Sequence, residues 1–278
     1  MRFSLFGKPE WYLWKKTLRA MVIIARSLSP TIQVREGSER FVFRPKSRME
    51  IFRYTTFFSK EEGTLKWLRD NVRDDAVLFD IGANVGLYSL YAARISPTAK
   101  VFAFEPHKLN FATLLENIFL NGLADRITPL ALALGDATGL FRLNYNSMES
   151  GASLTQLGHT NLSGDRTFKP KLAELVGSMS LDALIASGEV PRPSMIKIDV
   201  DGNELPILKG MSNLLGSSEG PKSLQVEINE GQRNVVVDFM ASVGYKIDHC
   251  HFTQSGQKLF KGEESYQTVP HNAVFIRA

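Results

Sequence analysis

A short glycine-containing segment, DIGANVG at residues 80–86, follows a stretch that is typical of a buried strand and precedes a predicted helix. Gly82 lets the backbone turn tightly, and Gly86 lets the helix approach the sheet and a ligand closely. The spacing differs from the G-x-G-x-x-G of dinucleotide sites, and the carboxylate of Asp80 in front of the turn would repel a pyrophosphate. An ammonium group would be attracted instead. The segment therefore predicts a site for a ligand that carries an amino-acid moiety.

An acidic residue ends the next predicted strand. Glu105 lies 23 residues after Gly82, and in doubly wound folds a carboxylate at this position accepts hydrogen bonds from ribose hydroxyls. Pro106 would form a rigid apolar shelf beside the base of such a ligand. The neighbouring His107 lies over the mouth of the site or on an exposed loop, and the sequence leaves both open. Taken with the glycine turn, Glu105 predicts a nucleoside-binding site.

A third group of polar residues follows the predicted strand at 194–200, at the sheet edge where ligands of open α/β folds bind. Asp199 would act as a general base on an acceptor group or would orient it, with Glu227 nearby at the end of the following strand. Alternatively, Asp199 and Asp201 bind backbone amides at the start of the next helix. Strand alternation places Lys197 on the face of Asp199, so an internal ion pair and a substrate contact are both open.

Metal binding is the weaker interpretation of these acids. Carboxylates suit Mg²⁺, but no spacing requires a metal among the five candidates, which are Asp199, Asp201, Glu204, Glu227 and Glu230. His249 and His251 flank the single cysteine, Cys250, yet neighbouring residues of a strand point to opposite faces. We therefore predict no resident metal. One cysteine also excludes an intramolecular disulfide.

The elements that position these residues alternate along the chain. Strands are predicted at 76–80, 100–105, 127–134, 140–145, 194–200, 224–228, 245–249 and 273–277, and helices at 86–95, 110–120, 180–187, 204–215 and 235–243. This alternation predicts an α/β fold with right-handed crossovers and a parallel sheet of five or six strands. The last two strands have no predicted helix between them, so we expect one antiparallel strand to close the sheet.

Residues 138–178 interrupt the alternation and are predicted to be an insertion. The stretch 146–167 is rich in Ser, Gly, Thr and Asn and has few large apolar side chains to anchor it. We expect a mobile lid that orders over the site when ligands bind, with Ser153 and Asn146 among its polar contacts. An ordinary surface loop is the alternative.

The chain has 278 residues, of which 44% are hydrophobic and 22% charged, a composition that excludes disordered and low-complexity classes. The net charge of +4 is uneven, because residues 1–48 carry +8 and the remainder carries −4. In this basic part, apolar side chains recur at helical spacing, namely Trp11, Trp14, Leu18, Met21 and Val22. We therefore expect a basic amphipathic helical extension at 1–50 and a catalytic domain at 51–278.

The partner of the extension has two interpretations. Packing on its own domain or on a second protomer, as in a homodimer, is the first, and peripheral contact with an anionic membrane is the second. The longest uninterrupted apolar run there covers six residues, 20–25, too few for a membrane span or a signal-peptide core. We expect a soluble, cytoplasmic protein, and we do not expect a nucleic acid as its partner.

Four segments, in this order, resemble FkbM-type methyltransferases, a class I family that uses S-adenosylmethionine: DIGANVG at 80–86, FEP at 104–106, SLDAL at 180–184 and IKIDVDGNE at 196–204. The resemblance covers roughly residues 60–278. It implies a doubly wound, mostly parallel seven-stranded sheet with an antiparallel last strand. It also implies an O-methyltransferase that acts on a hydroxyl of a small molecule, such as a sugar, a glycoside or a polyketide-like metabolite.

By this resemblance the S-adenosylmethionine-binding residues are Asp80, Gly82, Ala83, Asn84, Gly86, Glu105 and Pro106, and the catalytic candidates stay Asp199 and Glu227. Two positions depart from the family pattern, because Asp201 stands where Glu is usual and Asn203 where Ala is common. Two alternatives stay open: an RNA methyltransferase that uses the basic extension, and a non-catalytic protein that has kept the fold. The glycine spacing excludes an NAD-dependent oxidoreductase.

Overall fold

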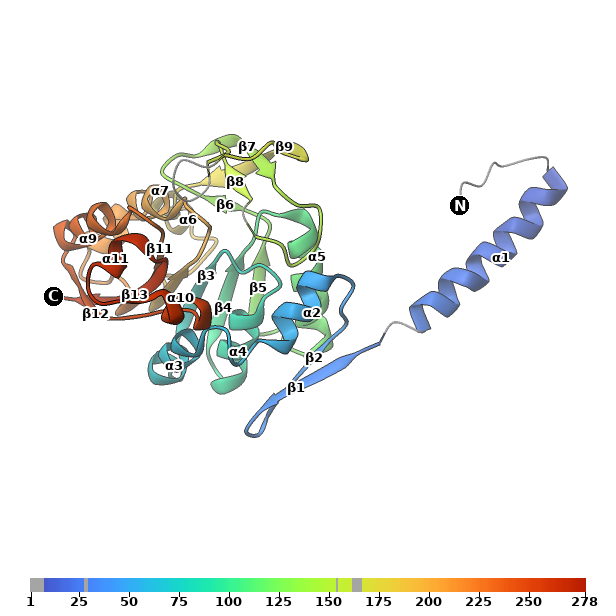
Figure 1. Cartoon of the computed structure of the whole chain (residues 1–278), viewed down its shortest axis with the longest axis horizontal. Helices are drawn as coiled ribbons and strands as arrows, with labels where there is room; N and C mark the ends of the chain where they lie inside the picture. The colour runs from blue at the N-terminus through green and yellow to red at the C-terminus, as the bar shows by residue number, and fades with distance from the viewer. Residues whose placement is uncertain (1–7, 28–29, 154, 162–166) are drawn as a thin grey trace.

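The structure is a computed structural model that describes residues 8–27, 30–153, 155–161 and 167–278. Within them, seven strands form a central sheet in the order β12-β13-β11-β10-β3-β4-β5 (Figure 1). Their bounds are β3 (Val77–Ile81), β4 (Lys100–Phe104), β5 (Ile127–Leu130), β10 (Met195–Ile198), β11 (Ser223–Ile228), β12 (Tyr245–His251) and β13 (His271–Arg277). The strands from β5 to β11 are parallel, and β13 runs antiparallel to both of its neighbours. The expected sheet is confirmed.

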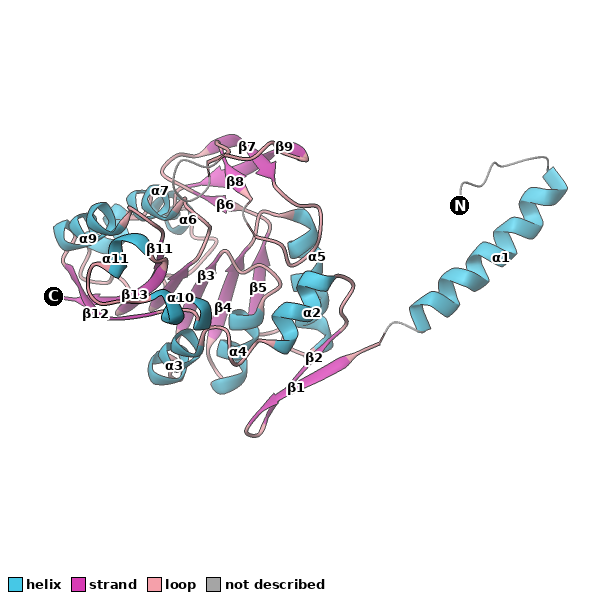
Figure 2. Ribbon diagram, in the orientation of Figure 1, coloured by secondary structure: helices cyan, strands magenta, loops and turns pink. Residues whose placement is uncertain are grey.

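Helices cover both faces of this sheet (Figure 2). One face packs against α3 (Glu62–Asn71), α4 (Leu87–Ile95) and α5 (Lys108–Leu120), and the other against α6 (Leu181–Ala186), α7 (Glu204–Lys209), α8 (Ser212–Gly216) and α9 (Arg233–Ser242). Successive side chains of β3 alternate between the two cores, so Leu78 packs with the first group of helices and Phe79 with the second. Burial on both faces explains why the central strands are continuously apolar.

Two helix predictions need correction. The helix expected over 204–215 is divided, because Gly210 ends α7 where a Cβ would lie 1.9 Å from the carbonyl oxygen of Gly135. Because the two backbones approach so closely, a side chain at position 210 would clash with residue 135, and the helix ends at this glycine. Two short helices, α10 (Gln254–Leu259) and α11 (Ser265–Thr268), also lie between the last two strands, where none was expected. The strands nevertheless pair antiparallel, as predicted.

The N-terminal part is not helical throughout. The helix α1 (Lys8–Ser27) is followed by the hairpin of β1 (Ile32–Glu36) and β2 (Glu39–Phe43) and by α2 (Arg48–Thr55). Phe41 and Phe43 are fully buried in the core of the domain. The side-chain amide of Asn121 at the end of α5 accepts from the backbone N–H of Val42 at 2.9 Å and donates to its carbonyl at 2.8 Å. The expected helical extension over 1–50 is therefore helical only in part, and its hairpin packs with the domain.

The insertion contains a second sheet. It has the order β6-β9-β7-β8, with bounds β6 (Ala133–Leu134), β7 (Gly139–Tyr145), β8 (Gln156–Leu157) and β9 (Leu172–Met179). The strand β9 was not predicted, because it forms by pairing with β7, which lies more than 25 residues away along the chain. Part of the expected lid, residues 154 and 162–166, lies outside the described residues. Among the described helices, none is both long and apolar enough to cross a membrane.

Candidate active site

The glycine turn joins β3 to α4 under the end of β10. The backbone has a positive φ at Gly82, Asn84 and Gly86, with values of 81°, 52° and 87°. The Asp199 N–H donates to the carbonyl oxygen of Ile81 at 3.0 Å. A Cβ on Gly82 would lie 1.9 Å from the Asp199 carbonyl oxygen. Only glycine therefore permits this contact between the turn and β10.

Three adjoining cavities run over this turn and share Gly82. The first, here the polar cavity, is lined among others by Arg53, Lys60, Ala83, Asn84, Asp199 and Glu227. The middle cavity is lined among others by Asn84, Glu105, Pro106, His107, Ser153 and Asp201. The apolar cavity is lined among others by Phe104, Pro106, Leu132, Leu134, Leu143 and Ile207. The sheet edge thus carries one trough that is charged at one end and apolar at the other.

Glu105 occupies the middle of this trough, as predicted. It is 5% exposed, and its two carboxylate oxygens accept from the backbone N–H of Asn84 at 2.7 Å and of His107 at 2.8 Å. Burial raises its pKa to about 7, although the two N–H donors oppose the rise. His107 is itself buried and caps α5, so the exposed-loop alternative for this residue is wrong.

Two predicted cofactor residues lie elsewhere than expected. Asp80 is fully buried and lines none of the three cavities, because its carboxylate accepts from Ser89 Oγ at 2.5 Å and lies 3.9 Å from Lys197 Nζ. Burial raises the pKa of Asp80 despite these partners. Gly86 also lies outside the three cavities, and a Cβ there would meet the side chain of Leu114 at 2.4 Å. Both residues shape the turn from outside the three cavities, and a direct contact of either with the cofactor stays a prediction.

Asp199 and Glu227 both line the polar cavity, in different protonation states. Lys197 Nζ donates to Asp199 Oδ2 at 2.8 Å, so the ion-pair interpretation of Lys197 is the correct one. Burial alone would raise the pKa of Asp199, but Lys197 and other cations outweigh burial and hold it below its usual range. Burial raises the pKa of Glu227 well above its usual range, and the charge of Asp199 adds to the rise. The cavity therefore holds two carboxyl groups whose pKa values are shifted in opposite directions.

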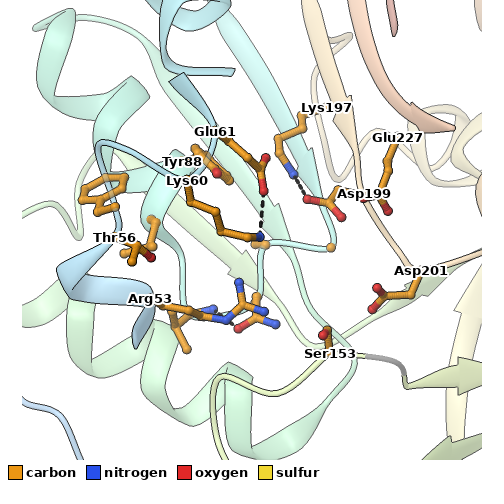
Figure 3. A pocket seen from close by; sticks show the side chains of 16 residues that line it. Arg53, Thr56, Lys60, Glu61, Tyr88, Ser153, Lys197, Asp199, Asp201 and Glu227 are labelled. Carbon is orange, nitrogen blue, oxygen red and sulfur yellow. Dashed lines mark hydrogen bonds and ion pairs between the residues drawn. The ribbon is translucent and has the colours of Figure 1, made fainter. Parts of the chain in front are cut away.

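Several side chains of the polar cavity were not predicted from the sequence, among them four that carry charge or a hydroxyl-bearing ring. Arg53 comes from α2, Lys60 and Glu61 precede α3, and Tyr88 lies in α4 (Figure 3). Lys60 Nζ donates to Glu61 Oε1 at 2.8 Å. Burial would lower the pKa of Lys60, but Glu61 outweighs it and raises that pKa, so the group stays cationic. These residues are not part of any sequence motif that indicates a catalytic or binding site. Only the fold brings them to the cavity.

The turn after β10 is organised by Glu204 rather than by Asp199. Glu204 is fully buried, and its Oε1 accepts from the backbone N–H of Val200 at 3.3 Å and of Gly202 at 3.0 Å. The interpretation of Asp199 as the helix cap is therefore wrong. Asp201 takes a φ of 60° in this turn, and its carbonyl accepts from the side chain of Gln156 in β8.

Asn203, the second departure from the family pattern, binds the same glutamine. Its Nδ2 donates to Gln156 Oε1 at 2.9 Å, which ties the turn to the insertion. On the other side of the trough, the carbonyl of Ala152 accepts from the side chains of Asn84 at 2.9 Å and Asn110 at 3.1 Å. Ser153 consequently lines the polar and middle cavities, whereas Asn146 lines none of the three. The insertion thus lies over the glycine turn.

No group of three or more His, Cys, Asp or Glu side chains in the described ranges is arranged to hold a metal ion. The absence of a resident metal stays a prediction.

A profile of the methyltransferase FkbM domain matches residues 80–247, more than half of the chain. The chain belongs to this family. The matched segment begins at Asp80 and includes the glycine turn, Glu105, Asp199 and Glu227. It excludes α2 and the Arg53 and Lys60 side chains, which therefore add to the site from outside the family domain.

Several known methyltransferases are similar to this chain. It is 35% identical over 161 residues to hexuronic acid methyltransferase AglP of Haloferax volcanii, covering 56% of this chain and 59% of that protein. It is 28% identical over 229 residues to 31-O-demethyl-FK506 methyltransferase FkbM of Streptomyces tacrolimicus, covering 73% and 84%. A crystal structure of methyltransferase FkbM from Methylobacillus flagellatus is 18% identical with a TM-score of 0.46, covering 73% and 44%. For three curated relatives, the match spans only 59–62% of their length.

Replacing Gly82 with alanine is expected to destabilise the protein by about 3 kcal/mol, because a backbone clash adds to the strain of a positive φ. Gly188→Ala is the matched control, since its φ of +78° is close to the +81° of Gly82 but nothing lies within 4 Å of the new Cβ. It should cost only about 1 kcal/mol. Urea denaturation measures both, and equal losses would contradict the close approach to Asp199.

Glu204 should make stability depend on pH. Burial raises its pKa from 4.5 to about 7. Because the folded-state pKa is raised, the protonated group stabilises the fold fully below the unfolded pKa, and this contribution is lost as pH rises through about 7. Glu204→Gln should therefore gain stability relative to wild type between pH 5 and pH 8, on the order of 3 kcal/mol. The free energy of unfolding, measured by denaturation at pH 5 and at pH 8, tests this prediction. Glu62→Gln, at an exposed position, is the control. A difference that does not change with pH would contradict the prediction.

Proposed function

We propose that this chain transfers a methyl group from S-adenosylmethionine to a hydroxyl oxygen of a small molecule, such as a sugar, a glycoside or a polyketide-like metabolite. The observation that carries the proposal is the ionised Asp199 carboxylate in a polar cavity that continues past the glycine turn to Glu105. Membership in the FkbM family supports the reaction class. The relatives named for a hexuronic acid and for a demethylated FK506 support the acceptor class.

The trough fits the three chemical parts of S-adenosylmethionine. The apolar cavity suits the base, with Pro106 between it and the middle cavity. Each oxygen of Glu105 accepts one backbone N–H and keeps a lone pair for a ribose hydroxyl. Gly82, Ala83 and Asn84 line the polar cavity, where the methionine part would lie. When bound, the cofactor supplies an activated methyl group on a sulfonium.

Asp199 orients the acceptor hydroxyl and takes its proton. A carboxylate with a lowered pKa is a weak base, so it acts as the hydroxyl oxygen begins to bond to the methyl carbon and its proton becomes acidic. Glu227 lines the same cavity and has a raised pKa, so in its protonated form it donates a hydrogen bond to the acceptor. The ion pair with Lys197 holds Asp199 in place during this step.

Arg53 and Lys60 complete the cofactor site by binding the methionine carboxylate. Arg53 uses Nε to donate to the carbonyl of Gly151, which leaves guanidinium N–H groups for a ligand. Its charge acts on both Glu105 and Asp199, so it lies between the ribose and acceptor ends of the trough. A carboxylate placed there would offset the positive charge that the two side chains bring to the cavity.

The other predictions from the sequence have less support. The basic helix α1 extends away from the central sheet in Figure 1, which does not favour an RNA methyltransferase that uses this helix beside a site at the sheet edge. Homodimer formation and a cytoplasmic location stay predictions.

The cofactor site is tested by titration calorimetry with S-adenosylhomocysteine. At pH 8, above the raised pKa of Glu105, wild-type protein should bind it, and Glu105→Gln should weaken binding about tenfold or more, because a ribose hydroxyl loses a charged acceptor. Glu116→Gln is the control, since Glu116 pairs with Arg44 and Lys46 away from the trough. Methyl transfer is then measured on hexuronides, hexosides and hydroxylated macrolides, with Asp199→Asn expected to be inactive. Failure of the wild type to bind S-adenosylhomocysteine would contradict the proposal.

The role of Arg53 is tested with two ligands that differ in the amino-acid part. Arg53→Gln should weaken binding of S-adenosylhomocysteine about tenfold but leave 5′-methylthioadenosine, which has no carboxylate, within about twofold. Arg48→Gln, an exposed arginine of the same helix, should change neither. If Arg53→Gln affects both ligands alike, or neither, while wild-type binding is intact, only the assignment of Arg53 is wrong.

A further inference from the structure

The helix α1 is separated from the body of the protein. It covers Lys8–Ser27 and extends away from the central sheet (Figure 1). Every side chain that the structure describes in this helix, from Trp14 to Ile24, is exposed. The described part of the catalytic domain therefore does not cover it, which disfavours packing of the helix on its own domain.

Apolar side chains form one face of this helix. Trp14, Leu18, Met21 and Val22 follow the i, i+4, i+7, i+8 spacing that places residues on one side. They are 46%, 58%, 56% and 48% exposed. Large apolar side chains that are exposed together on one face, rather than singly, indicate a surface that binds something.

Basic side chains form the opposite and adjoining faces. Lys15, Lys16 and Arg19 lie there, and Ile23 lies between Lys16 and Arg19 around the helix. No Asp or Glu occurs at any position between residues 11 and 35. The helix therefore combines an apolar face with a flank whose charged side chains are all basic.

We propose that α1 lies in the plane of an anionic lipid bilayer, with the apolar face among the acyl chains and the basic side chains at the headgroups. This combination is what interfacial helices use, since each Lys or Arg near the surface adds attraction to acidic lipids. A second copy of the helix is a poor partner because α1 carries five basic residues and a single acid, Glu10, so few acids are available to pair across an interface. The helix binds the surface without crossing it, in agreement with the lack of a membrane-spanning helix among the described residues.

The test is co-sedimentation of the full chain with vesicles. Vesicles of phosphatidylcholine with 30% phosphatidylserine should bind the protein at least tenfold more strongly than vesicles of phosphatidylcholine alone, and added salt should reduce the difference. The double variant Leu18→Glu, Met21→Glu should lose at least tenfold of the binding. Ile23→Gln, on the cationic side of the helix, is the matched control and should bind within about twofold of wild type.

Three results would overturn the proposal. The first is no binding to either kind of vesicle. The second is equal loss of binding in the double variant and in Ile23→Gln. The third is a wild-type dimer in light scattering that the double variant makes monomeric, without any binding of the wild type to acidic vesicles, because the apolar face would then pair with a second copy. Thermal unfolding of the variants shows that the domain stays folded, since Leu18 and Met21 lie outside its core.

Discussion

The site depends on the ion pairs that the buried ammonium group of Lys197 makes with two carboxylates, those of Asp199 and Asp80. Lys197 is 1% exposed, donates to Asp199, lies 3.9 Å from Asp80 and faces the ring of Tyr88 with its nitrogen 5.0 Å from the centroid. A buried charge is tolerated only when it is paired, so this lysine holds the ends of β3 and β10 in one arrangement. The same ion pair lowers the pKa of Asp199, and the charge of Asp199 contributes to the raised pKa of Glu227. Lys197 thus connects two neighbouring strands and shifts the pKa of the carboxylate at the site.

Charge in the polar cavity is balanced by parts of the chain that are far apart in sequence. The family domain supplies the acids Asp199 and Glu227, and the segment before it supplies the cations Arg53 and Lys60. The hairpin of β1 and β2 and the helix α2 therefore belong to the working domain, because Phe43 is buried in its core and stacks on Tyr54 of α2 with the ring centroids 4.2 Å apart. A cavity with only the acids would repel a carboxylate ligand.

The insertion serves the site through backbone groups as much as through side chains. The carbonyl of Ala152 is bound by Asn84, and Gln156 binds both the carbonyl of Asp201 and the side chain of Asn203. These contacts connect the insertion to the glycine turn and to the turn after β10. The hydrogen bond to Gln156 therefore explains an asparagine at position 203. An alanine there has no side-chain amide and could not make this bond.

The sequence by itself determined most strands and helices of the family domain, the glycine turn, and the positions of Glu105, Asp199 and Glu227 at or near the carboxyl ends of their strands, because these depend on local periodicity and on short spacings within one βα unit. Only the tertiary structure decided that Asp80 turns away from the trough, that β9 pairs with β7, and that the segment carrying Arg53 reaches the polar cavity. Each of these depends on groups distant in sequence that meet across a sheet edge or in a buried ion pair. A local sequence pattern does not specify these long-range contacts. The partner of a buried charge, or of an unpaired strand edge, depends on how the whole domain packs.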